Sequence, residues 1–152
     1  METIERTDHF DVPTSPERVF PLLCPVREYD WIPGWECDLL RTASGVAEED
    51  CIFRTRFPRD GDPMTWVVSR YEPPVRIEFT CFVPESHVMR LKIALEREGE
   101  GTRLHWTRRW HSVGPKGDAW VASWSESAYR QNMRDLERRL AHYVAAGEML
   151  RP

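Results

Sequence analysis

The sequence predicts an α+β fold in which a curved antiparallel sheet of six to seven strands wraps around a long C-terminal helix. Three observations support this fold class: an amphipathic pattern from Gly114 to Gly147, a run of segments with period-two alternation before it, and a helix start at residues 14–17. The apolar face of such a sheet is buried against the helix, and any space that the two leave becomes a pocket. We expect one domain over residues 1–152, because this length is enough for one core.

The chain begins with a predicted strand in which Ile4, Phe10 and Val12 share one face. Arg6 and Asp8 fall on the same apolar side of this strand. Pro13 ends the strand. Charged residues on an inward face require partners, so this strand already indicates polar contacts inside the protein.

Two short helices are expected after this strand. Thr14 or Ser15 caps the first helix, and Glu17 stands three residues after Thr14, as in a capping box. Pro25 ends this helix, and a second helical turn is expected over residues 26–31. The corner at residues 31–35 then turns the chain back into the sheet.

From residue 36 onward, apolar side chains recur at every second position, which is typical of antiparallel strands with one buried and one solvent-exposed face. We expect strands over residues 36–42, 51–57, 64–68, 75–83, 87–96 and 103–110. Turns are expected at Ser44-Gly45, over residues 58–63, at Pro73-Pro74, at residues 84–86 and at residues 99–101.

The last segment is expected to be one helix with Asp118 at its N-cap and Gly147 at its end. Its apolar stripe consists of Val121, Trp124, Ala128, Leu136, Leu140, Tyr143 and Val144. Gln131 and Asn132 lie within or beside this stripe. Polar residues inside a core-facing stripe indicate that part of the helix faces a cavity.

Composition and charge exclude several classes of partner and site. The net charge of −4, with basic and acidic residues intermixed, argues against a nucleic-acid partner. The four cysteines show no spacing typical of zinc ligands, so we expect no metal and no cofactor. We also expect no signal peptide, no membrane insertion and a cytoplasmic location with reduced cysteines. The arginines near the end of the chain, interrupted by Asp135 and Glu137, are interpreted as a solvated helix face.

The residues at three places in this pattern resemble a known superfamily. The helix start Ser15-Pro16-Glu17-Arg18-Val19-Phe20, the corner Trp31-Ile32-Pro33-Gly34-Trp35 and the strand run before a last helix are similar to the START-like, Bet v 1-like superfamily. Within it, the chain resembles the bacterial polyketide cyclase/dehydrase and lipid-transport group. This resemblance implies a helix-grip fold over a hydrophobic cavity. It implies no shared catalytic motif, and the fold alone does not determine the function.

Eleven residues are expected to contact a ligand, because alternation or helical spacing directs them inward. They are Phe53, Trp66, Phe79, His87, Met89, Leu91, Trp106, Arg108, Trp110, Trp124 and Ala128. So many wide side chains on a curved sheet favour a lined cavity, although each of the apolar ones taken alone is more consistent with core packing.

Asp8, Arg41, His87 and Arg108 are the polar residues at apparent inward positions. Asp8 could form a compensated pair with Arg108 or with Arg41 and orient a polar group of a ligand. The alternative is that bulges, or a different register, place these residues outside or at the rim of the sheet.

The sequence contains no assembled catalytic constellation, so the catalytic residues stay unknown and an enzymatic activity stays open. His87 is the histidine that an acid/base step in the cavity would use, and Arg108 or Tyr129 would polarise a carbonyl group.

Three functional hypotheses therefore remain. The first is a carrier or sensor that binds a small hydrophobic or aromatic molecule. The second is a polyketide cyclase, aromatase or dehydratase that uses the same cavity, and the third is a co-chaperone-like protein-interaction domain. Phe82, an outward aromatic residue, marks a candidate homodimer contact.

Overall fold

The computed structural model describes residues 2–56 and 62–151. Its elements are β1 (Thr3–Val12), α1 (Pro16–Val19), η1 (Phe20–Leu23), η2 (Glu28–Asp30), β2 (Cys37–Arg41), β3 (Ile52–Thr55), β4 (Met64–Glu72), β5 (Arg76–Val83), β6 (His87–Glu98), β7 (Gly101–Ser112), α2 (Pro115–Ala122) and α3 (Glu126–Ala146). Phe57 and most of the turn expected over residues 58–63 lie outside the described residues. In the described part of the chain, no helix is both long enough and apolar enough to span a bilayer.

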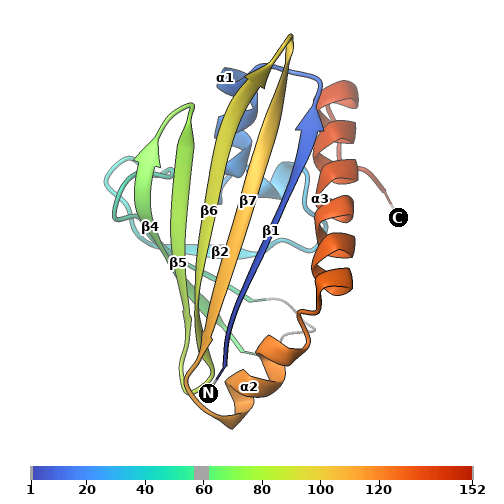
Figure 1. Cartoon of the computed structure of the whole chain (residues 1–152). Coiled ribbons are helices and arrows are strands. Elements are labelled where there is room, and N and C mark those ends of the chain that lie inside the picture. The colour runs from blue at the N-terminus through green and yellow to red at the C-terminus, as the bar shows by residue number, and fades with distance from the viewer. Residues whose placement is uncertain (1, 57–61, 152) are drawn as a thin grey trace.

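The described strands form one antiparallel sheet with the order β1-β7-β6-β5-β4-β3-β2. The helix α3 runs alongside β1 at one edge of the sheet, and the short helices α1 and η1 lie behind its upper part (Figure 1). This arrangement confirms the predicted α+β helix-grip fold, with a curved sheet, a long C-terminal helix and short helices after the first strand.

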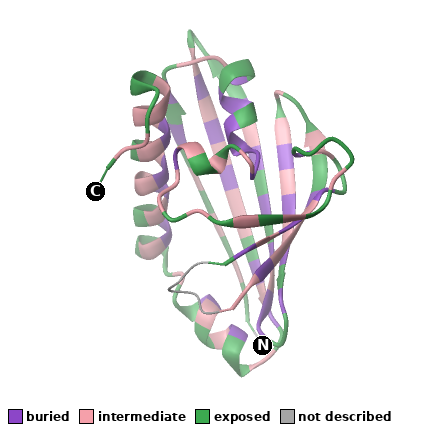
Figure 2. Ribbon diagram, turned by 180° about the vertical axis from the view of Figure 1, so that it is seen from behind, coloured by how far each residue is buried: buried purple, intermediate pink, exposed green. Residues whose placement is uncertain are grey.

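The inner face of the sheet follows the predicted alternation. Along β5, Ile77, Phe79, Cys81 and Val83 are buried, whereas the residues between them are at least partly accessible. The same alternation of buried and more exposed residues is visible along the neighbouring strands (Figure 2). Phe82 points outward with 47% of its surface exposed, and its role in a dimer stays a prediction.

The last segment consists of two helices, so the expectation of one helix from Gly114 to Gly147 is wrong in its first part. α2 ends at Ala122, and α3 begins at Glu126 after a break in which Ser125 adopts an extended conformation. Gly114, and not Asp118, precedes the first turn of α2. The break arises because the Ser125 side chain accepts a hydrogen bond from Ala128 N and starts a new helix.

Replacing Ser125 with alanine is expected to destabilise the protein by about 1 kcal/mol, because the first turn of α3 loses its side-chain cap. Chemical denaturation followed by circular dichroism measures this change. Ser127→Ala is the matched control, since this exposed serine caps no backbone N–H among the described residues. Equal stability of the Ser125 variant and the wild type would contradict the assignment of the cap.

The core-facing side of α3 carries Tyr129, Met133, Leu136 and Leu140. Their spacing of four, three and four residues places them on one face of the helix. This face packs mainly against β1 (Figure 1). Because α3 lies over one edge of the sheet, it does not by itself cover the inner faces of β3, β4 and β5.

The short helices close one side of the sheet. The fully buried Trp31 donates its indole N–H to the carbonyl of Leu22 at 2.8 Å, and Trp35 donates to the carbonyl of Pro25 at the same distance. The capping box expected from Thr14 and Glu17 does not form in the described residues. Glu17 instead forms an ion pair with Arg97 on β6, at 2.8 Å.

Candidate ligand-binding cavity

A cavity of about 490 Å³ lies between the inner face of the sheet and the covering elements. Strands β3 to β7 form its floor, and residues 28–35, α2 and α3 form its cover. All seven tryptophans of the chain line it. The volume falls within the range of about 300–1,000 Å³ that is usual for small-molecule sites.

Three aromatic rings form the wall on β3, β4 and β5. Phe53 and Trp66 stack with their centroids 5.8 Å apart, and Phe79 meets both rings edge to face. The Trp66 indole N–H donates to Thr55 Oγ1 at 2.9 Å, which fixes its orientation. Because these rings support one another, the wall keeps its shape without filling the interior.

A second aromatic group lies where β7 meets α2. Trp110 and Trp124 stack at 5.3 Å, and Tyr129 meets Trp110 edge to face. Trp120 of α2 stacks on His87 of β6 at 5.4 Å. These contacts link the cover of the cavity to its floor.

Ten of the eleven residues expected to contact a ligand lie along this cavity. Ala128 is the one that does not, because it lies on α3 beside the buried Tyr129 and not at a cavity-facing position. Asn132 lines the cavity, as the polar break in the helix stripe predicted, whereas Gln131 is exposed and bonds to Asp135. Whether these residues contact a ligand stays a prediction.

Arg108 of β7 is the basic residue on the floor of the cavity. Its Nη1 donates to Asn132 Oδ1 at 2.8 Å, and its guanidinium carbon lies 5.6 Å from the ring centroids of both Trp106 and Tyr129. Burial lowers the pKa of this guanidinium. The amide and the two rings therefore hold a half-buried cation in place inside an apolar chamber.

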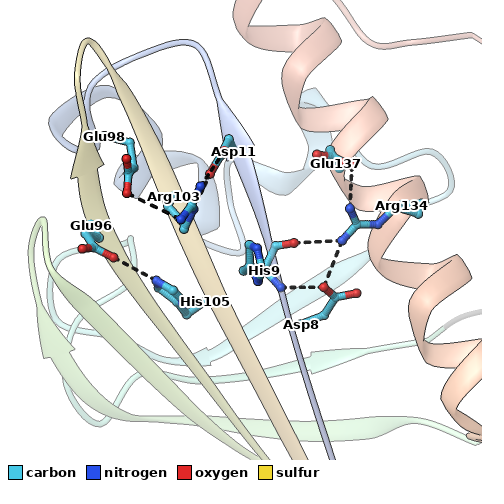
Figure 3. A network of polar contacts seen from close by, with 9 residues as sticks. All are labelled: Asp8, His9, Asp11, Glu96, Glu98, Arg103, His105, Arg134 and Glu137. Carbon is cyan, nitrogen blue, oxygen red and sulfur yellow. Dashed lines mark hydrogen bonds and ion pairs between the residues drawn. The ribbon is translucent and has the colours of Figure 1, made fainter.

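The ion pair expected between Asp8 and Arg108, or between Asp8 and Arg41, is absent from the described residues. Asp8 instead bonds to Arg134 of α3 at 3.1 Å (Figure 3). The reason is that β1 lies at the sheet edge beside α3, so its inward side chains meet this helix and not the cavity. Neither Asp8 nor Arg41 lines the cavity.

Glu28 of η2 also lines the cavity, and it is not among the eleven residues expected from the sequence. Burial raises the pKa of this carboxyl well above its usual value, and the charge of Arg108 opposes the shift only in part. A detectable signal existed, because Glu28 precedes Trp31 by three residues and Ile32 by four in a predicted helical turn. All three residues line the cavity.

His87 lies at the end of the cavity next to α2. Its Nδ1 is 2.8 Å from Ser86 Oγ, and only 3% of its surface is exposed. Burial lowers the pKa of this imidazole to about 4, so the ring is neutral near pH 7. A neutral ring stacked on Trp120 serves as part of the wall, and as an acid/base group it would act only as a weak base.

Several polar groups of the cavity wall lack partners. Trp106, Trp120 and Trp124 bury their indole N–H groups without a hydrogen bond in the part of the chain that the structure describes. An unpaired buried donor lowers the stability of the folded protein by about 1–3 kcal/mol. The stability of the fold alone therefore does not explain these three indole groups in the cavity wall.

No three His, Cys, Asp or Glu side chains of residues 2–56 and 62–151 cluster closely enough to hold a metal ion. Tyr129 is buried, and its hydroxyl donates to the carbonyl of Trp106 at 3.4 Å. Two further groups of the cavity bear on its chemistry, the Glu28 carboxyl with its raised pKa and the Arg108 guanidinium held by Asn132. Together they can donate a proton and hold negative charge on an oxygen.

Solved structures with the same fold include proteins of different origin. The chain superimposes on DynU16, a protein of the dynemicin biosynthetic locus, with a TM-score of 0.66 and 20% identity over 95% of this chain, but it spans only 48% of DynU16. It matches Ara h 8.0201 with a TM-score of 0.68 and 15% identity, over 95% of this chain and 99% of that protein. A protein from Rhodobacter sphaeroides matches with a TM-score of 0.67 and 20% identity, over 97% of this chain and 100% of that one.

At these levels of identity, the structural matches establish the fold and nothing more. A search of curated protein sequences found no match. The family model described as polyketide cyclase / dehydrase and lipid transport matches residues 1–141. This match confirms the resemblance seen in the helix start, the tryptophan corner and the strand run. The chain therefore belongs to the polyketide cyclase / dehydrase and lipid transport family.

Proposed function

We propose that this protein binds a small hydrophobic or aromatic molecule in the cavity between the sheet and α3, and acts as a carrier or sensor of that molecule. The observation that carries the proposal is the gathering of all seven tryptophans around one cavity of about 490 Å³. Tryptophans that served only to fill a core would close such a space, because interiors pack densely. Family membership supports the same class of ligand.

The test uses an uncharged aromatic probe, N-phenyl-1-naphthylamine, titrated into the protein by calorimetry. Leu91 lies on the cavity floor with 6% of its surface exposed, so Leu91→Trp would fill part of the space. We expect this variant to bind the probe about tenfold more weakly, or not at all, which corresponds to at least about 1.4 kcal/mol.

Lys92→Trp is the matched control, because Lys92 is the next residue of β6 and its side chain is exposed. This variant should bind the probe as the wild type does. Thermal unfolding of both variants checks that the fold is kept. Wild-type protein that binds no uncharged aromatic probe, or two variants with equal affinity, would overturn the proposal.

One observation favours a second function, an enzyme of the cyclase, aromatase or dehydratase type. Glu28 is a carboxyl with a raised pKa that faces the same cavity as Arg108. A carboxyl whose neutral form is favoured, in the same cavity as a cation, is suited to general acid catalysis on a carbonyl compound. Turnover of a bound poly-β-ketone analogue that is lost in Glu28→Gln would support this second function, and binding without turnover would exclude it.

A further inference from the structure

Arg108 is a cation without a counterion. Among residues 2–56 and 62–151, no carboxylate lies within ion-pair distance of its guanidinium, and its one hydrogen-bond partner is the neutral amide of Asn132. The other N–H groups of the guanidinium are free to bind an acceptor in the cavity. The floor of the tryptophan-lined cavity therefore carries a positive charge that no neighbouring carboxylate of the described residues neutralises.

This placement is unfavourable for folding alone. Burial lowers the pKa of Arg108, which means that the charged form has lost hydration that its neighbours replace only in part. The rings of Trp106 and Tyr129 stabilise the cation, and Asn132 fixes its direction, but neither carries negative charge. An anion that enters the cavity would supply the missing partner.

The other titratable groups that face this space leave it positive. Asp135 on α3 is already bound to Arg138 at 2.7 Å, and Arg139 on the same helix adds a second cation to the lining. Burial raises the pKa of Glu28 on η2 and of Tyr129 on α3, which favours their neutral forms. Burial also raises the pKa of Cys81 on β5 to about 12 and lowers that of His87 on β6 to about 4, so both are neutral near pH 7.

We propose that the ligand of this cavity is an aromatic acid whose anionic oxygen, from a carboxylate or an enolate, binds to Arg108 beside Asn132 while its ring system lies among the tryptophans. A guanidinium offers parallel N–H donors that match two oxygens of a carboxylate, so the interaction fixes the orientation of the ligand as well as its charge. This inference rests on the proposed function and specifies the class of molecule that the cavity takes.

The test compares two probes of nearly equal shape, 2-naphthoate and 2-naphthamide, by calorimetry at neutral pH. The wild-type protein is expected to bind the acid at least tenfold more tightly than the amide. In Arg108→Gln this preference should disappear while the amide still binds, which shows that the variant is folded. In Arg109→Gln, which alters the exposed neighbour on the same strand, the preference should remain.

The outcomes separate the two proposals. If neither probe binds to the wild type, the cavity itself is not a binding site and the proposed function fails. If both probes bind with equal affinity, the proposed function stands and the assignment of Arg108 as an acid-binding residue is overturned. A preference for the acid that survives in Arg108→Gln would also overturn it.

A second measurement covers the case in which Arg108→Gln does not fold. As the pH rises through the elevated pKa of Glu28, this carboxyl becomes negative and repels the acid, so the preference of the wild type for 2-naphthoate should weaken. Glu28→Gln carries a neutral side chain of the same shape and should keep the preference at high pH. An equal loss in both proteins would count against the proposal.

Discussion

Replacing Gly117 with alanine is expected to destabilise the protein by about 3 kcal/mol or more, because the added methyl group would overlap the backbone of a neighbouring turn. A Cβ atom at this position would lie 1.7 Å from the carbonyl oxygen of Ser86 and 2.8 Å from Ser112 Oγ. The Ser86 oxygen accepts the backbone N–H of Val113 at 2.9 Å, so it cannot move without breaking that hydrogen bond. α2 must therefore shift away from the sheet.

Thermal unfolding measures this loss, and we expect the melting temperature to fall by about 6–12 °C for a chain of this size. Gly114→Ala is the matched control, since its Cβ would approach the nearest atom, the Glu85 carbonyl oxygen, only to 3.3 Å. Its melting temperature should change much less. Trp120 lies on α2 and lines the cavity, so Gly117→Ala should also weaken the binding of an aromatic probe. An unchanged melting temperature would show that α2 does not pack as described.

Acid is expected to destabilise the protein through His87. Burial lowers the pKa of this group from about 6.5 in the unfolded chain to about 4 in the folded protein. The neutral ring therefore contributes its full stability above pH 6.5, and this contribution is lost as the pH falls toward 4, where protonation favours the unfolded state. A shift of this size corresponds to about 3 kcal/mol.

The measurement is the free energy of unfolding as a function of pH, in the wild type and in His87→Gln. The variant can be less stable at neutral pH, because it loses the stacking on Trp120, but its stability should fall less steeply between pH 6.5 and 4. His9→Gln replaces an exposed histidine and should keep the steep fall. Parallel curves for the wild type and His87→Gln would falsify the assignment of His87 as the buried titrating group.

The strands could be predicted from the sequence because one physical signal dominates them. A sheet with one buried face requires an apolar side chain at every second position, and β5 and β6 follow this rule along most of their length. The inward direction of Phe53, Trp66 and Trp106 follows from the same rule. Most of the cavity floor was therefore predictable without knowledge of the helices.

The break between α2 and α3 was not predictable from periodicity. The apolar spacing continues through residues 121–128, and serines occur both inside helices and at their caps. What starts the new helix is the cap in which Ser125, in an extended conformation, accepts a hydrogen bond from Ala128 N, and apolar spacing does not reveal it. In the helix that follows this break, Tyr129 and not the neighbouring Ala128 is buried.

The polar contacts could not be predicted from the sequence for a related reason. The inward side of Asp8 was predicted correctly, but its partner depends on which part of the sheet α3 covers. Glu28 was missed because glutamate is usually a surface residue, although its spacing to Trp31 and Ile32 was a signal. The partner of Asp8 and the position of Glu28 both depend on how the helices lie over the sheet, and tertiary packing determines that arrangement.

The most direct test of the central claim is nuclear magnetic resonance of the protein with ¹³C-labelled methionine methyl groups, titrated with N-phenyl-1-naphthylamine. Met64 and Met89 line the cavity, Met133 is fully buried outside its lining, and Met149 lies near the end of the chain beyond α3. If an aromatic molecule enters the cavity, ring currents should shift the signals of Met64 and Met89, while those of Met133 and Met149 stay in place. A titration in which Met64 and Met89 do not respond, or in which Met149 alone responds, would contradict the account.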